Sequence, residues 1–220
     1  MDNQLRYARR YLKICRKHVS LGKLIDVGSS TNPFPNLASE AGFEVTVMDF
    51  TRPQCLTEGV AWVEASLNDN RILMQYQERF DVVSAWAVLE HVVDPKLAVK
   101  TLAGLCCNGG TILLSTPEIG TFLTRHARGH SCWFSPPSHL HLFSAAAMIQ
   151  LFTAEGCVLI RQGRIELNSA RWLARYGVGI AEAIVGLFLR YVFSRKWYTM
   201  RRDHTQKFKG IKFFVFKKVS

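Results

Sequence analysis

The chain lacks the features that mark secreted or disordered proteins. Its six cysteines form no Cys-x-x-Cys pair and show no disulfide-like spacing, which favours a reducing, cytoplasmic compartment. The charged N-terminal segment is followed by no apolar stretch, so no signal peptide is predicted. The 220 residues contain no repeat or low-complexity tract, and 48% of them are hydrophobic. We therefore expect one globular domain over residues 1–220, with a core at 20–165.

Acidic residues are scarce. The chain has 17 Asp and Glu against 28 Lys and Arg, which gives a net charge of +11. The surplus lies at the two ends, in residues 1–23 and 195–218, and the middle is nearly balanced. Basic ends of this kind would attract a polyanion such as an anionic lipid surface or a nucleic acid. A merely solvated surface is an equal alternative for such charge runs.

Long apolar runs are also absent, apart from residues 176–193. This run is marginal in length for a membrane span and contains Glu182 and Arg190, so no transmembrane segment is predicted. It belongs to an insertion, 168–208, that we expect to be helical and to precede the last strand. The insertion would form an interfacial helix or a cap over the functional site, with an ordinary core-packed helix as the alternative.

A strand, a tight turn and a helix start are predicted between Lys23 and Phe34. The apolar run Leu24–Val27 ends at Gly28, and such a turn lets backbone N–H groups and a helix N-terminus face a ligand. A second apolar strand, 43–48, stops at Asp49, and an acid at this offset typically binds ribose hydroxyls. The two segments together predict a site for an adenosine-containing cofactor.

Strand and helix patterns alternate through the first two thirds of the chain. Helices are predicted at 4–19, 34–41, 69–77, 97–105 and 144–155, and strands at 24–27, 44–48, 60–63, 80–85, 111–115, 158–160 and 211–216. Asn108-Gly109-Gly110 is expected to end the fourth helix. This alternation predicts βαβ crossovers and a mainly parallel sheet, with ligands bound at the carboxyl ends of the strands.

A loop over 118–142 breaks the alternation and is predicted to be a substrate lid. It is rich in residue types that bind zinc, namely His126, His130, Cys132, His139 and His141. Their spacing fits no standard structural zinc pattern, so no metal site is predicted.

Four stretches carry a resemblance to a known family. They are Asp26-Val-Gly-Ser-Ser-Thr-Asn32, Asp49, the segment Phe80–Pro95, and Gly110–Pro117 followed by His139–Ser144. Together they resemble the class I S-adenosylmethionine-dependent methyltransferases. Within these the chain is most similar to the small-molecule branch that includes ubiquinone-biosynthesis O-methyltransferases and enzymes of polysaccharide and lipid pathways. The resemblance implies an α/β fold, namely a Rossmann-like three-layer αβα sandwich with a mostly parallel seven-stranded sheet and a C-terminal helical insertion.

The first of these stretches departs from the family pattern. Only Gly28 remains of the three usual glycines, and Ser30 and Asn32 stand at the other two positions. Serine is small enough for a close cofactor approach, and asparagine tolerates left-handed backbone better than most residues. The loop is interpreted as a variant that still binds cofactor, with a non-catalytic binding protein of the same fold as the alternative.

The resemblance implies S-adenosyl-L-methionine as cofactor and assigns roles around it. Gly28 would admit the amino-acid portion, and Asp26 would orient either the loop or the amino group. Asp49 would bind both ribose hydroxyls with Phe50 alongside. Residues 65–67 would flank adenine, and Trp86 and Ala87 would line the methionine end, although Trp86 could equally be core. The expected cofactor-binding residues are Asp26, Gly28, Ser29, Ser30, Asp49, Phe50, Leu67, Ala85 and Trp86.

Methyl transfer requires mainly that an acceptor be aligned with the methyl group and that water be excluded. A hydroxyl acceptor would need a general base, and His91, His139 and His141 are the candidates, each of which could instead hydrogen-bond a loop carbonyl or cap a helix. We predict an enzyme that methylates a small-molecule, lipid-linked or sugar-like acceptor at oxygen, with peripheral contact to an anionic membrane. RNA methylation is an alternative, although the basic ends lack the interleaved aromatic residues of a strand-binding groove.

Overall fold

The structure is a computed structural model that describes residues 3–54, 56–69, 71–117, 119, 137–165 and 211–219. Most of the predicted lid loop, with His126, His130 and Cys132, lies outside the described residues. The predicted helical insertion at 168–208 lies wholly outside them.

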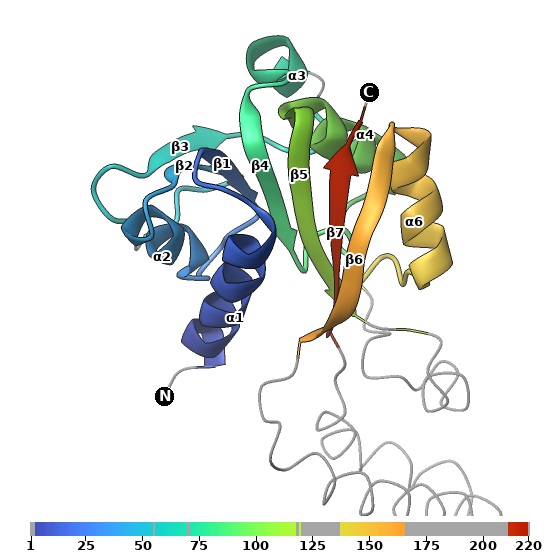
Figure 1. Cartoon of the computed structure of the whole chain (residues 1–220), viewed down its shortest axis with the longest axis horizontal. Coiled ribbons are helices and arrows are strands. Elements are labelled where there is room, and N and C mark those ends of the chain that lie inside the picture. Colours follow the sequence, from blue (N-terminus) through green and yellow to red (C-terminus); the bar gives the residue numbers. More distant parts are fainter. Residues whose placement is uncertain are drawn as a thin grey trace, which may run out of the picture.

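A seven-stranded sheet with the strand order β3-β2-β1-β4-β5-β7-β6 forms the centre of the fold (Figure 1). The strands are β1 (Lys23–Val27), β2 (Glu44–Asp49), β3 (Ala61–Glu64), β4 (Phe80–Trp86), β5 (Cys106–Pro117), β6 (Cys157–Ile165) and β7 (Ile211–Lys218). Strands β1 to β5 pair in parallel, whereas β7 runs antiparallel to both β5 and β6. The predicted Rossmann-like, mostly parallel sheet is therefore confirmed.

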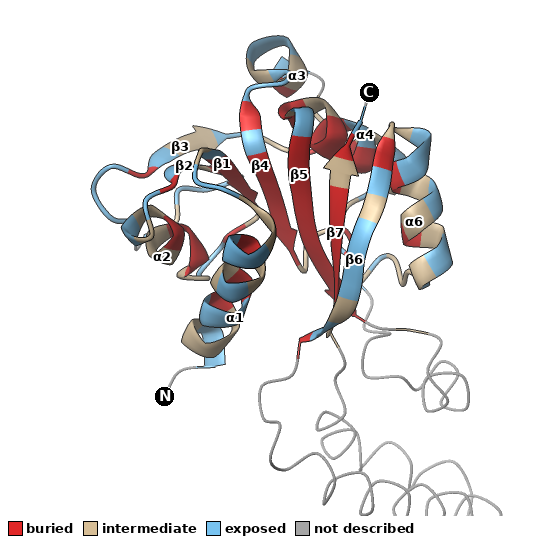
Figure 2. Ribbon diagram, in the orientation of Figure 1, coloured by how far each residue is buried: buried red, intermediate tan, exposed pale blue. Residues whose placement is uncertain are grey.

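Helices cover both faces of this sheet and complete a three-layer sandwich. The helices are α1 (Asn3–His18), α2 (Phe34–Glu40), α3 (Arg71–Tyr76), α4 (Pro95–Leu105) and α6 (Ala145–Ala154). One core cluster joins α1 and α2 to the sheet, and a second joins α3, α4 and α6 to the other face. Figure 2 shows the central strands buried between the helices.

Strand β1 contributes side chains to the core on both faces of the sheet. Side chains alternate along a strand, so Leu24 packs with α1 and α2, whereas Ile25 and Val27 pack with α4 and its neighbours. The strand is buried from Leu24 to Val27, as expected for a parallel strand covered on both sides.

The segment between α4 and β5 differs from the prediction. Strand β5 starts at Cys106, which is already extended and pairs with Phe80, so the helix ends before Asn108-Gly109-Gly110. Gly109 adopts a φ of 74°, and the pairing register with β4 shifts beside it. The glycines therefore form an irregularity inside the strand rather than the helix terminus that the sequence predicts.

The N-termini of α4 and α6 are closed by side chains. Ser144 accepts a hydrogen bond from the Ala147 N–H at 3.1 Å. Asp94 accepts hydrogen bonds from the Lys96 and Leu97 N–H groups at 2.9 and 3.1 Å, so α4 begins at Pro95, two residues earlier than predicted. Among the described helices, none has the length and apolar character needed to cross a membrane.

We expect Asp94→Ala to lower the free energy of unfolding by about 1 kcal/mol, because two N–H groups of α4 lose their acceptor. Asp94→Asn retains a side-chain oxygen and should cost much less. Urea unfolding with an unchanged m-value would measure both effects. Equal losses in the two variants would contradict the capping role.

Candidate functional site

The tips of β1 and β2 meet at the predicted cofactor site. The Gly28 N–H donates to the Met48 carbonyl at 2.8 Å, which ties the turn to the end of β2. The Asp49 carboxylate accepts a hydrogen bond from the Ser30 N–H at 2.8 Å and another from the Phe50 N–H at 2.8 Å. Asp49 therefore faces the Gly28 turn, and its contact with ribose stays a prediction.

The turn uses left-handed backbone at two residues. Gly28 has a φ of 69° and Ser30 a φ of 48°, so Ser30, and not Asn32, takes the conformation usual for glycine. Asn32 instead accepts a hydrogen bond from the Phe34 N–H at 3.0 Å. The Asn32 side chain therefore stabilises the first turn of α2.

Close packing also requires glycine at position 28. A side-chain carbon added there would lie 2.9 Å from Cγ2 of Val88, which belongs to the loop after β4. The Gly28 turn therefore lies against the loop that also carries Glu90 and the predicted catalytic residue His91. The two halves of the candidate site are therefore adjacent in space.

Asp26 lies beneath the turn, with 1% of its surface exposed. Its carboxylate accepts hydrogen bonds from the hydroxyls of Ser29, at 2.6 Å, and Ser84. Burial raises the pKa of Asp26 to about 7, although the two hydroxyl contacts act in the opposite direction. Of its two predicted roles, these contacts favour the one in which Asp26 orients the loop.

Three other predicted cofactor residues lie around the same edge. Phe50 is 70% exposed directly after Asp49. Leu67 is buried, and its carbonyl accepts a hydrogen bond from the Thr101 hydroxyl at 2.8 Å, which anchors the loop predicted to flank adenine. Ala85 is buried within β4. Their contact with cofactor stays a prediction.

Trp86 packs inside the protein. Its ring stacks on Tyr11 of α1 with centroids 4.1 Å apart and meets the edge of Phe34 at 5.5 Å. These contacts favour the core-packing alternative for this tryptophan.

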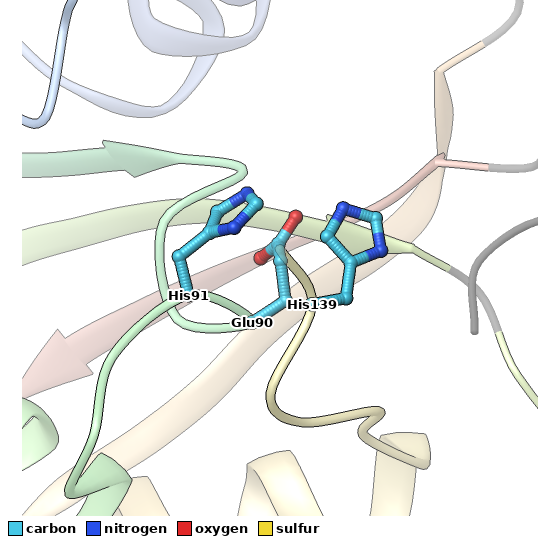
Figure 3. A group of neighbouring side chains, drawn as sticks. All are labelled: Glu90, His91 and His139. Atoms are coloured by element: carbon cyan, nitrogen blue, oxygen red, sulfur yellow. The ribbon is translucent and has the colours of Figure 1, made fainter. Parts of the chain in front are cut away.

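The three predicted catalytic histidines gather beside the loop after β4. The rings of His91 and His139 lie 4.8 Å apart in an edge-on arrangement (Figure 3). The His91 Nδ1 lies 2.6 Å from the Ser138 carbonyl oxygen, which can only accept, so Nδ1 carries the proton. The ring of His141 is turned towards the Val93 carbonyl, with Nε2 3.4 Å away.

Glu90 organises this cluster and was missed by the sequence analysis. Its backbone carbonyl accepts hydrogen bonds from the Leu140 and His141 N–H groups, which joins the end of the lid loop to the β4 loop. Its side chain is 1% exposed, and burial raises its pKa to about 7. The only signal in the sequence is its place beside His91 in the fourth-strand motif.

Comparison with known proteins agrees with this geometry. Residues 2–162 match the sequence model of the methyltransferase domain family. The ubiquinone biosynthesis O-methyltransferase of Stutzerimonas stutzeri is 28% identical over 109 residues, covering 46% of this chain and 47% of that protein. The Idiomarina loihiensis protein of the same name is 28% identical over 148 residues, covering 57% and 61%. The chain thus spans about half the length of the curated relatives it matches.

A solved structure shows the same fold over nearly the whole chain. It is the Burkholderia thailandensis 1,6-didemethyltoxoflavin-N1-methyltransferase with bound 1,6-didemethyltoxoflavin and S-adenosylhomocysteine. Its TM-score is 0.63 at 14% identity, and the match covers 99% of this chain and 80% of that one. Because the family match covers most of the chain, this protein is a member of the methyltransferase domain family.

Proposed function

We propose that the protein transfers a methyl group from S-adenosylmethionine to a hydroxyl of a small-molecule, lipid-linked or sugar-like acceptor. The observation that supports this most is the Asp49 carboxylate turned towards the Gly28 turn, which in turn contacts Val88 of the loop that carries His91. The likeness to ubiquinone biosynthesis O-methyltransferases favours oxygen as the methylated atom.

The chain's own residues would then hold and orient the two reactants. Bound S-adenosylmethionine supplies a methyl group that is already activated by the adjacent sulfonium. Asp49 would hold the ribose, and the Gly28 turn would admit the amino-acid portion. Because Nδ1 of His91 is protonated, Nε2 keeps a lone pair that can accept the acceptor's hydroxyl proton.

The exposed face of α1 supports an amphiphilic or anionic acceptor. Five cationic side chains are exposed along this helix: Arg9, Arg10, Lys13, Arg16 and Lys17. A cationic face of this kind is attracted to anionic lipid headgroups and would bring the enzyme to a membrane surface.

We expect Asp49→Ala to weaken binding of S-adenosylhomocysteine by about tenfold to a hundredfold, because a charged acceptor for the ribose hydroxyls is lost. Isothermal calorimetry measures the change. Glu44→Gln is the matched control, since Glu44 is exposed at the opposite end of the same strand.

Binding that is equal in Asp49→Ala and Glu44→Gln would refute the ribose assignment. Absence of binding by the unmodified protein would instead favour the non-catalytic alternative.

We expect the folded protein to lose stability as the pH rises from about 4 to about 7. Asp26 has a folded pKa raised from 3.8 to about 7, so over this range the folded state keeps a proton that the unfolded chain releases. Asp26→Asn cannot ionise and should gain stability relative to the unmodified protein across that window, by on the order of 4 kcal/mol at most.

Chemical unfolding at several pH values would measure this difference. A difference between Asp26→Asn and the unmodified protein that stays constant with pH would contradict the raised pKa. Glu44→Gln again serves as control, because Glu44 is exposed on the same sheet.

We expect His139→Ala to slow methyl incorporation into an acceptor found by screening lipid and glycolipid extracts, while the affinity for S-adenosylhomocysteine stays unchanged. The cofactor is held at the Gly28 turn and not by the histidines, so only the acceptor side should suffer. His141→Ala should behave in the same way. Full activity in both variants would show that His139 and His141 take no part in catalysis.

A further inference from the structure

Three side chains of metal-binding type meet after β4. One ligand atom each from Glu90, His91 and His139 lies within 4.8 Å of the other two. Figure 3 shows the Glu90 carboxylate between the two imidazole rings. Ligand atoms around one small cation lie roughly 3.4 Å apart, so modest side-chain rotations would bring all three onto a common centre.

Burial of the Glu90 carboxylate is energetically unfavourable. Its Oε2 atom is buried and lacks a well-formed hydrogen bond among the described residues, although burial raises the pKa of this carboxyl and the nearby Thr116 hydroxyl acts in the opposite direction. A buried carboxylate oxygen without a well-formed hydrogen bond is unfavourable and calls for a physical reason. A bound cation would supply a partner for this atom and stabilise the charged form.

His91 is arranged as histidine ligands usually are. Its Nδ1–H donates to the Ser138 carbonyl at 2.6 Å, which fixes the ring and leaves Nε2 as the available donor atom. The His91 side chain is exposed, so an ion held there would keep a position open for solvent or an acceptor.

We propose that Glu90, His91 and His139 form a site for a divalent transition-metal ion of the Zn²⁺ class. Two imidazoles and one carboxylate suit Zn²⁺ better than Mg²⁺ or Ca²⁺, which prefer oxygen ligands. The spacing of the lid residues predicts no metal because it leaves out Glu90 and His91, which come from a different loop.

The inference rests on the proposed function and gives the ion a role in it. With the Nε2 lone pair of His91 on the ion, this nitrogen would no longer act as the base; an acceptor hydroxyl bound to the ion would instead release its proton to water more readily. Its oxygen would then form a bond to the methyl carbon, while the carbon–sulfur bond breaks and its electron pair stays on sulfur. The contact between Gly28 and Val88 places this chemistry next to the cofactor turn.

The test is a calorimetric titration of ZnCl₂ into the full chain after treatment with a chelator and dialysis. We expect one site that Glu90→Gln and His139→Ala weaken by about tenfold or more. His18→Ala is the matched control, because His18 lies on α1 outside the cluster. His91→Ala, at an exposed position, serves as a further variant if Glu90→Gln does not fold.

Cobalt substitution identifies the ligands. The Co²⁺ form should show d–d absorption without a thiolate charge-transfer band, and the d–d absorption should be lost in the cluster variants. A thiolate band, Zn²⁺ affinity unaffected by Glu90→Gln, or equal affinity for Mg²⁺ would overturn the proposal. Calorimetry with S-adenosylhomocysteine on the same samples separates the two ideas, since cofactor binding without zinc binding refutes the metal site alone.

Discussion

The close approach of Gly28 to Val88 is the constraint on which the arrangement of the site depends. A side-chain carbon at Gly28 would lie 2.9 Å from Val88, so the turn after β1 can lie against the loop after β4 only because no side chain intervenes. The same turn is bound on its other side to β2 through Met48 and Asp49. Pairing of β1 with β2 and β4 brings three strand ends together, and the glycine lets the turn between them lie against the loop that carries His91.

Most of the sheet could be predicted because burial leaves a strong signal in parallel strands. Apolar runs such as Leu24–Val27 and residues 80–85 are buried on both faces and appear in their predicted places. The helix ends at Leu105 as predicted, but the start of β5 was predicted wrongly, because Asn108-Gly109-Gly110 is a turn signal in local terms. Pairing of Cys106 with Phe80 extends the strand through those residues, and such pairing is visible only in three dimensions.

The site was predictable where a role follows from position after a strand, and not where it depends on contacts between loops. Asp49 follows β2 directly and faces the turn as predicted. The sequence could not show that Ser30 rather than Asn32 is left-handed, because asparagine is the type that better tolerates that backbone. Nor could it show that Glu90 supports the lid histidines, since its carbonyl contacts Leu140 and His141 from far along the chain.

Two buried acids, Asp26 and Glu90, each need a physical explanation. Asp26 and Glu90 are each 1% exposed, and burial raises the pKa of both. A domain selected for stability alone would replace them by apolar residues, since an acid in such a place costs free energy. Asp26 has two hydroxyl donors and is explained by the loop that it orients. The Oε2 atom of Glu90 lacks a well-formed hydrogen bond in the described part of the chain, with the Thr116 hydroxyl acting on the carboxylate, and a cation shared with its two histidine neighbours would stabilise it.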